Sequence, residues 1–156
     1  MYDTYNLDAI ASSLIDLTGC LNSPRQDEIL LREAGVSLDR ALFPLLVRLG
    51  AAPTMSVAQL ADRAGRDPST ISRQLAKLEK LGLAKRPSTH EDGRVRAAAI
   101  TEAGVRTVAA ISDARRKLLG ELVQGWSANE RRMFPKLVQK LADAMRDKAG
   151  SSAITY

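Results

Sequence analysis

The stretch from residue 56 to residue 86 carries the clearest alternation of apolar and polar positions in the chain. In its second half, apolar residues recur three or four positions apart, as on the buried face of an α-helix: Ile71, Leu75, Leu78 and Leu81. Asp67 is a suitable N-cap for this helix, Pro68 fits its first position, and Gly82 would end it. The pattern therefore predicts a helix that buries one face and exposes the other.

A shorter helix is predicted immediately before it. Ser56 and Gln59 have the spacing of a capping box, and Gly65 would close the helix. Two helices joined by so short a turn form a helix–turn–helix. The exposed face of the second helix carries hydroxyls, an amide and cations, which suit a DNA major groove: Ser69, Thr70, Ser72, Arg73, Gln74, Lys77 and Lys80. The alternative is a helical hairpin whose basic face is only solvated.

An extended hairpin is predicted after these helices. Residues 83–86 leave the helix, and residues 87–93 are polar and rich in turn-forming residues. Arg94, Arg96, Ala98 and Ile100 then alternate as in a returning strand. A helix–turn–helix followed by a β-hairpin is a winged helix–turn–helix. Two features favour DNA binding over a solvated helical hairpin: the order of these elements, and the presence of a single acidic residue, Glu79, among the cations of the second helix's exposed face.

The two ends of the chain are predicted to form long helices. Residues 6–22 place apolar side chains in a coiled-coil-like seam: Leu7, Ile10, Leu14, Leu17 and Leu21. Ser127 and Glu130 form another capping-box pattern, and the helix that they open carries Phe134, Leu137, Leu141 and Met145 on one face. A small winged domain does not need this much apolar surface. We therefore expect these helices to pair with those of a second copy, rather than to complete a monomeric core.

Weaker signals mark the remaining elements. Ser23, Pro24 and Gln26 are typical of an N-cap, a first-turn proline and a capping-box partner, in a short helix that ends near Gly35. Ser37 would open the next helix, and Pro44 within its pattern predicts either a kink or a later start. Residues 54–55 could add a short strand. Alanine favours helix over strand in residues 95–100, so periodicity alone does not assign that segment.

Composition narrows the class of protein. At 156 residues the chain has the length of one ordinary domain, it lacks a run of about 18 apolar residues that would span a membrane, and its N-terminus lacks the layout of a signal peptide. One Cys excludes an internal disulfide, and one Cys with one His is a poor basis for a metal site. No nucleophile elbow or Gly-rich phosphate loop is present, and His90 lies in the predicted turn. We predict a cytoplasmic protein that is not an enzyme and holds no metal or cofactor.

The net charge of +5 is unevenly distributed along the chain. Residues 1–36 hold 2 Lys or Arg against 6 Asp or Glu, whereas residues 63–96 hold 9 against 4. The basic excess thus begins at the predicted helix–turn–helix. Clustered positive charge is typical of nucleic-acid binding, because cations displace the counterions condensed on phosphates.

Two segments together resemble the MarR family of bacterial transcription regulators. Residues 67–86 read DPSTISRQLAKLEKLGLAKR, and residues 91–104 read EDGRVRAAAITEAG. They are similar to the recognition helix and wing of that family in their Ser/Thr-rich helix start, their L-E-K-L-G-L end, their wing D-x-R and their closing I-T-E-x-G. No single piece is specific, but their order and spacing are. The likeness is strong over about residues 54–104 and extends to the rest of the chain only in length and helix order.

The resemblance implies a mainly α fold, a winged helix–turn–helix with N- and C-terminal dimerisation helices and a small β-wing. Residues 1–36 and 102–148 would form the dimerisation region, residues 37–101 the DNA-binding region, and residues 149–156 a flexible tail, all in a single compact domain. It also implies that residues 95–100 form a strand, with Thr101 capping the helix that follows. In the family, the D-x-R motif places an arginine in the minor groove, here Arg94.

The expected function is that of a transcriptional repressor, a homodimer on a pseudo-palindromic site in double-stranded DNA, released by a small aromatic or amphipathic ligand. The residues expected to bind DNA are Ser56, Pro68, Ser69, Thr70, Ser72, Arg73, Lys77, Asp92, Arg94 and Arg96. Those expected at the dimer interface are Leu7, Ile10, Leu14, Leu17, Leu137, Leu141 and Met145. Because some relatives sense peroxide through a lone cysteine in the first helix, one alternative is the same regulator switched by oxidation of Cys20. The other is a helical interaction protein that does not bind DNA.

Overall fold

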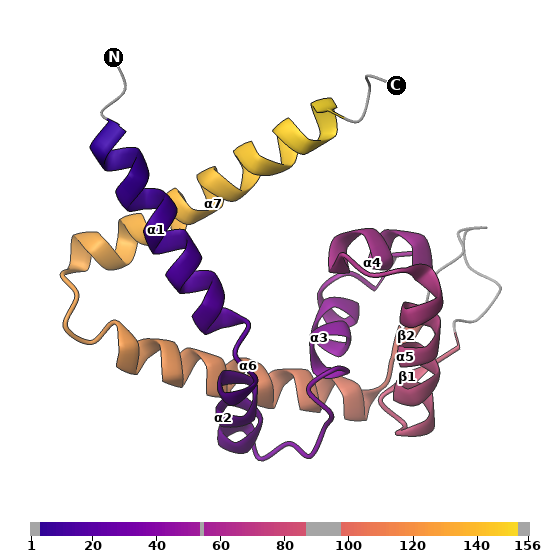
Figure 1. Cartoon of the computed structure of the whole chain (residues 1–156). Helices are drawn as coiled ribbons and strands as arrows, with labels where there is room; N and C mark the ends of the chain where they lie inside the picture. The colour runs from indigo at the N-terminus through magenta and orange to yellow at the C-terminus, as the bar shows by residue number, and fades with distance from the viewer. Residues whose placement is uncertain (1–3, 54, 87–97, 153–156) are drawn as a thin grey trace. The chain divides into compact units, whose positions relative to one another are not determined.

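The computed structural model describes residues 4–53, 55–86 and 98–152. The chain forms two compact units, residues 1–116 and residues 117–156, and one helix runs across their boundary. The helices and strands, marked in Figure 1, are α1 (Thr4–Leu21), α2 (Pro24–Ala34), α3 (Phe43–Ala51), α4 (Val57–Ala64), α5 (Pro68–Lys80), β1 (Ala84–Lys85), β2 (Ala99–Ile100), α6 (Glu102–Leu122) and α7 (Ala128–Ser152). The fold is mainly α with a small antiparallel sheet, as the sequence predicted.

The main core of the first unit lies where α3, α4 and α5 meet the β1–β2 pair (Figure 1). Its fully buried side chains come from all three helices: Leu46, Leu49, Leu60, Ile71 and Leu78. The apolar stripe predicted on α5 supplies three of the buried positions, Ile71, Leu75 and Leu78, whereas Leu81 is exposed. Truncating a buried leucine to alanine in such a core costs about 2–5 kcal/mol of stability. This core therefore holds α5 in one orientation.

A second apolar cluster joins α2 to the start of α3 and to α6. It consists of Leu31 on α2, Phe43 on α3 and Ile111 on α6, all of them buried. Val36 and Leu38, in the connection between α2 and α3, pack against it. The cluster anchors the first half of α6 to the helices of the first unit.

Local capping signals place most helix ends correctly. Ser56 Oγ accepts a hydrogen bond from Gln59 N at 3.2 Å, and Gln59 Oε1 accepts one from Ser56 N at 2.9 Å, which completes the predicted capping box of α4. The same reciprocal pair forms between Ser127 and Glu130 at the start of α7. Gly65 ends α4 with φ of +60°, in the left-handed region where glycine is favoured.

Two helix starts differ from the sequence pattern. Ser23 lies at the N-cap of α2, followed by Pro24, but its side chain makes no capping hydrogen bond, so the predicted box with Gln26 does not form. The next helix begins at Phe43 rather than at Ser37, which places Pro44 in the first turn, where its missing N–H breaks no helical hydrogen bond. Of the two outcomes predicted for Pro44, the later start is the one observed.

The strand predicted over residues 95–100 is shorter in the described part of the chain. Only Ala99 and Ile100 are in a strand, and they pair with Lys85 and Ala84 respectively. Ala98 is buried but lies outside the strand, and residues 95–97 are not among the described residues. Met55, predicted to extend the sheet, is not in a strand, and residue 54 is also not described.

The second unit contains the end of α6 and the whole of α7. The predicted break at Gly125 and Trp126 is a turn, and the Trp126 ring meets that of Phe134 edge-on, with centroids 5.0 Å apart. Pro135 lies inside α7, a feature that the sequence pattern did not bring out. The helix continues to Ser152, whereas a flexible tail was expected from residue 149. Within the described ranges, no helix is long and apolar enough to pass through a lipid bilayer.

Candidate nucleic-acid interface

The start of α5 is fixed by a single carboxylate. Asp67 Oδ1 accepts a hydrogen bond from Thr70 N at 2.8 Å and another from the hydroxyl of Ser69, while Asp67 Oδ2 accepts one from Thr70 Oγ1 at 2.6 Å. These bonds, the one from Ser69 foremost, hold the pKa of Asp67 well below its usual range because they stabilise the ionised carboxylate. Asp67 is therefore the N-cap that the sequence predicted, and it stays charged beside the hydroxyls of the first turn.

The buried stripe of α5 directs the opposite side of the helix to solvent. Most of the residues proposed for base reading or phosphate contact are exposed: Pro68, Ser69, Ser72, Arg73 and Lys77. Thr70 is half-buried, and its Oγ1 accepts a hydrogen bond from Arg73 Nη2 at 3.3 Å. The guanidinium of Arg73 is thus linked through Thr70 to Asp67. Hydroxyl, cationic and backbone groups lie together over the first two turns of the helix.

The hydroxyl network at this helix start is a detail that sequence reasoning missed. Asp67 was identified as an N-cap, but the engagement of both hydroxyl protons was not anticipated. The available signal was the order Asp-Pro-Ser-Thr, because a capping carboxylate has lone pairs left after it accepts one backbone N–H. With their protons donated to Asp67, Ser69 and Thr70 present lone pairs to an incoming partner.

Of the other residues proposed to bind DNA, one is engaged in a helix cap and three lie outside the described residues. Ser56 is half-buried, and its hydroxyl accepts the capping-box hydrogen bond of α4. Asp92, Arg94 and Arg96 lie outside the described residues, as does His90. Lys85 and Arg86, at the end of β1, are exposed cations that were not on the list of expected contacts.

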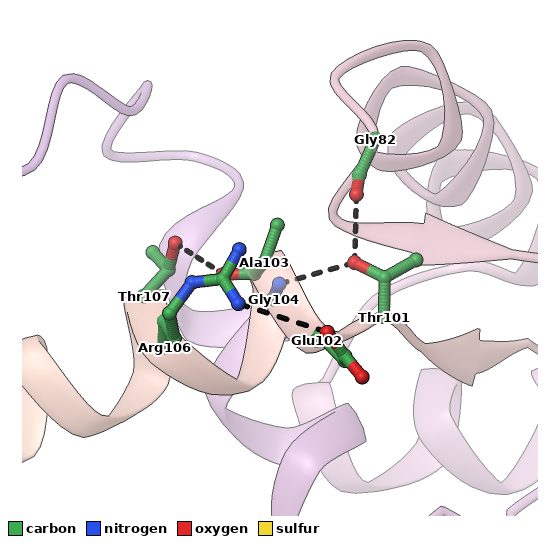
Figure 2. A network of polar contacts seen from close by, with 7 residues as sticks. All are labelled: Gly82, Thr101, Glu102, Ala103, Gly104, Arg106 and Thr107. Carbon is green, nitrogen blue, oxygen red and sulfur yellow. Dashed lines mark hydrogen bonds and ion pairs between the residues drawn. The ribbon is translucent and has the colours of Figure 1, made fainter.

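A group of polar contacts around Thr101, here called the joint, connects the end of α5 to the start of α6. Figure 2 shows Thr101 between the two: its Oγ1 donates a hydrogen bond to Gly82 O at 2.7 Å and accepts one from Gly104 N at 3.1 Å. The backbone adds a bond from Thr101 N to Leu83 O at 3.1 Å. Thr101 is thus the predicted N-cap of α6, and it also holds the chain just after α5.

Gly104 on α6 lies very close to the backbone of Leu83 and to the side chain of Ile100. A Cβ atom at residue 104 would lie 2.2 Å from Leu83 O and 2.6 Å from Ile100 Cγ1, so only glycine fits. Further along the first turns of α6, Thr107 Oγ1 donates to Ala103 O at 2.9 Å, and an Arg106–Glu102 ion pair spans 3.8 Å (Figure 2). The joint therefore sets how the chain leaves α5 and enters α6.

The seam residues of α1 and α7 are exposed within the described chain. Leu7 is 49% exposed and Ile10 is 43% exposed, and Leu14 and Leu17 are also exposed. On α7, Leu137 is 57% exposed and Met145 is 63% exposed, with Leu141 exposed beside them. Cys20 is a free, exposed thiol near the end of α1. Among the residues that the structure describes, no three His, Cys, Asp or Glu side chains are grouped closely enough to hold a metal ion.

The fold is that of a winged helix–turn–helix protein. A short turn joins α4 to α5, α5 has an exposed cationic face, and an antiparallel strand pair follows it. Comparison with known proteins agrees with this fold assignment. The model of the MarR family matches residues 38–96. The uncharacterized HTH-type transcriptional regulator YxaD of Bacillus subtilis (strain 168) is 34% identical over 111 residues, which cover 71% of this chain and 78% of that protein.

Solved structures show the same fold. A MarR family protein from Bacillus stearothermophilus superposes with a TM-score of 0.74 at 18% identity, covering 94% of this chain and 99% of the other. The Mycobacterium tuberculosis MarR family protein RV2887, in complex with salicylic acid, superposes with a TM-score of 0.61 at 26% identity, covering 82% and 93%. The chain belongs to the MarR family of transcriptional regulators. Members of this family are DNA-binding regulators rather than enzymes, and they are dimers.

Proposed function

We propose that this protein represses transcription as a homodimer on a pseudo-palindromic operator, and that a small aromatic or amphipathic acid releases it. The observation that carries the proposal is the exposed face of α5, opposite its buried stripe, where Asp67 accepts hydrogen bonds from the first-turn hydroxyls and Thr70 accepts one from Arg73. A helix presented in this way suits the major groove, where side chains can tell base pairs apart.

In this proposal, α5 reads bases and the segment after β1 reads the neighbouring groove. Ser69, Thr70, Ser72 and Arg73 face base edges, while Ser56, Pro68 and Lys77 contact the backbone. Arg94 enters the minor groove, with Asp92 limiting its rotamers through a charge-assisted pair, and Arg96 also contacts the DNA. The exposed cations Lys85 and Arg86 support the placement of phosphates along this side.

Dimerisation is supported by the exposed apolar residues of the terminal helices. Soluble chains seldom leave a contiguous apolar stripe in water, and the α1 seam and one face of α7 are such stripes. A two-fold assembly would present two copies of α5 to half-sites about one helical turn apart. The two arrangements of the dimer must bind the effector with different affinity for release to occur. The complex of RV2887 with salicylic acid supports an acid as the effector.

The second candidate is the same regulator switched by oxidation of Cys20. The exposure of the thiol favours it, since oxidants must reach the sulfur. Mild peroxide should then abolish operator binding by the wild type and leave Cys20→Ser unaffected. If both proteins keep their affinity after peroxide, the thiol has no switching role.

The base-reading role is tested by selecting bound sequences from random duplexes and then measuring Arg73→Ala on the selected site. A bidentate contact to a base is worth about 1–3 kcal/mol of discrimination, so Arg73→Ala should lose roughly ten- to a hundredfold preference for the operator over random DNA. Arg25→Ala, which removes the same charge from α2, is the matched control. If Arg73→Ala weakens binding to all duplexes equally, the residue contacts phosphate and the assignment is wrong.

A further inference from the structure

The first turn of α5 carries two hydroxyl groups that both give their protons to one carboxylate. Asp67 Oδ1 accepts a hydrogen bond from the Ser69 hydroxyl, and Asp67 Oδ2 accepts one from Thr70 Oγ1 at 2.6 Å. Because an ionised carboxylate can only accept hydrogen bonds, each hydroxyl is the donor in its bond. Asp67 is ionised at neutral pH, since these bonds hold its pKa well below its usual range. A hydroxyl has a single proton, so neither has one left to give to DNA.

The two hydroxyl oxygens can still accept hydrogen bonds, since each has two lone pairs. Ser69 is exposed, and among the described residues nothing donates to its oxygen. Thr70 Oγ1 accepts from Arg73 Nη2 at 3.3 Å, which leaves it one lone pair. The opposite side of α5 is buried at Ile71 and Leu75. A partner that approaches the exposed side therefore meets only lone pairs on these two hydroxyls.

A phosphate of the DNA backbone is a poor partner for these hydroxyls. Phosphate oxygens accept hydrogen bonds, as the two hydroxyl oxygens do, so no proton is available for a bond between them. The charge of Asp67 would also repel a phosphate. Its carboxylate already accepts from Thr70 N at the N-terminus of α5, where an anion would otherwise bind. The two hydroxyls are therefore better suited to base edges than to the backbone.

The major groove offers two donors to such a hydroxyl, the N6 amino group of adenine and the N4 amino group of cytosine. Guanine and thymine present oxygen or nitrogen acceptors there, and thymine adds its methyl group. A serine or threonine whose proton rotates freely suits either kind of base. Ser72 on the same helix is of that kind, because within the described residues its hydroxyl forms no hydrogen bond. A hydroxyl whose proton is held by Asp67 cannot adapt in this way.

We infer that Asp67 makes Ser69 and Thr70 read only amino bases, so that the operator base facing each of these hydroxyls is an adenine or a cytosine. Every base pair has one amino base and one keto base, so Asp67 determines which strand carries which. Asp67 is a positioning residue, since it acts on DNA through the two hydroxyls. The partner is the DNA that members of this family bind, and the assignment of bases rests on the proposed base-reading role of α5.

Selection of bound sequences from random duplexes, repeated with single variants, locates the two bases. Ser69→Ala and Thr70→Val each remove one hydroxyl, so each should abolish the preference at one position of the half-site. The wild type should prefer adenine or cytosine there by about tenfold, because two acceptors that face each other form no hydrogen bond. Ser72→Ala is the matched control, and it should leave the preference at these two positions unchanged whatever its effect on overall affinity. Thermal melts establish that each variant is folded.

Asp67→Asn should reverse the polarity of one hydroxyl only. The amide keeps one oxygen, which Thr70 N needs as the cap, so the amide nitrogen replaces Oδ2 and donates to Thr70 Oγ1. The Thr70 proton is then free to reach a guanine or a thymine, while Ser69 still donates to the amide oxygen. The preference at the Thr70 position should fall from about tenfold to about twofold, and that at the Ser69 position should persist. A variant that only loosened the helix start would weaken both positions alike.

Base analogues test the hydrogen bond itself with the wild-type protein. Where the selected base is adenine, purine in its place lacks the N6 amino group, whereas 7-deazaadenine keeps that group and lacks N7. Purine should lower affinity about tenfold, and 7-deazaadenine should bind within about twofold of adenine. Where the selected base is cytosine, 2-pyrimidinone removes the N4 amino group in the same way.

Guanine or thymine selected at either position would refute the assignment and leave the proposed function standing, because an operator would still be read. Three other results would also refute it: purine that binds as well as adenine, Asp67→Asn that keeps the wild-type selection at both positions, and Ser69→Ala or Thr70→Val that selects the wild-type sequence. A uniform loss of affinity in Ser69→Ala, with base preference unchanged, would indicate a phosphate contact and refute it too. If the protein selects no operator at all, the proposed function fails and the assignment fails with it.

Discussion

At the scale of single residues, Asp67 organises the hydrogen bonds at the start of α5. Its carboxylate accepts hydrogen bonds from Ser69 and Thr70, and these bonds lower its pKa relative to the unfolded chain. In an unfolded chain, an aspartate has a pKa of about 4. A group whose pKa is lowered by folding stabilises the protein fully above its unfolded pKa. That stabilisation is lost as the pH falls through the lower pKa of the folded state.

Asp67→Asn separates this titration from the capping role, because asparagine is also a good N-cap but carries no charge. The melting temperature of the variant should lie below that of the wild type at pH 7, and the difference should shrink as the pH falls below about 4. Glu130 and Asp143, whose pKa values are also lowered, titrate in both proteins and cancel in the comparison. A difference that stays constant from pH 7 to acid conditions would contradict the assignment.

Gly104 is the residue on which the joint between α5 and α6 depends. In Gly104→Ala, the new methyl group would meet a backbone oxygen at 2.2 Å, and overpacking of this kind costs about 1–3 kcal/mol. The melting temperature should fall by several degrees, and operator affinity should fall with it. Gly120→Ala on the same helix is the matched control, since nothing lies within 4 Å of its new Cβ. It should stabilise the protein by about 0.5–1 kcal/mol. Equal effects of the two changes would refute the close approach.

At the scale of secondary structure, the sequence predicted what is decided within a few residues. Ser56 with Gln59, Asp67 with Pro68, and Ser127 with Glu130 are local signals, and the helices begin where these signals place them. The start of α3 was predicted only as an alternative, because Ser37 looks like a cap until the turn at Asp39 is known; there Asp39 O accepts hydrogen bonds from Leu42 N and Phe43 N.

Features that depend on contacts between distant residues escaped prediction. Thr101 was expected to cap α6, but its hydrogen bond to Gly82 connects residues 19 positions apart and leaves no local pattern. The strand at residues 99–100 was expected, but only with the help of the family resemblance, because alanine favours helix; it pairs with β1, and Ala98 beside it is buried in the main core.

The terminal helices carry a prediction about assembly. Leu14 on α1 and Leu141 on α7 are exposed in the described chain and lie in the stripes proposed to form the dimer interface. A protein with both Leu14→Asp and Leu141→Asp should sediment as a monomer or as misfolded protein, because burying a carboxylate between subunits is costly. Ser13→Asp places the same charge on α1 beside the seam and should leave the dimer intact. A well-folded wild-type monomer at micromolar concentration would refute the dimer.

At the scale of the whole molecule, charge and symmetry act together. Residues 63–96 carry a basic excess, so a dimer would carry two basic surfaces of this kind, one from each copy. Phosphate contacts from each surface would contribute to the salt dependence of binding. Two such surfaces can add their binding free energies only when both half-sites face the protein at the correct spacing.

The spacing of the half-sites tests this arrangement directly. Inserting about five base pairs at the centre of the selected operator turns one half-site by half a helical turn, onto the far side of the duplex. Affinity should then fall to that of an isolated half-site, because the second recognition helix no longer reaches bases. Replacing the same central base pairs without changing the length should leave affinity nearly unchanged, apart from effects of DNA flexibility. A protein that reads each half-site as an independent monomer would bind all three duplexes equally, and that result would contradict the homodimer as the DNA-binding form.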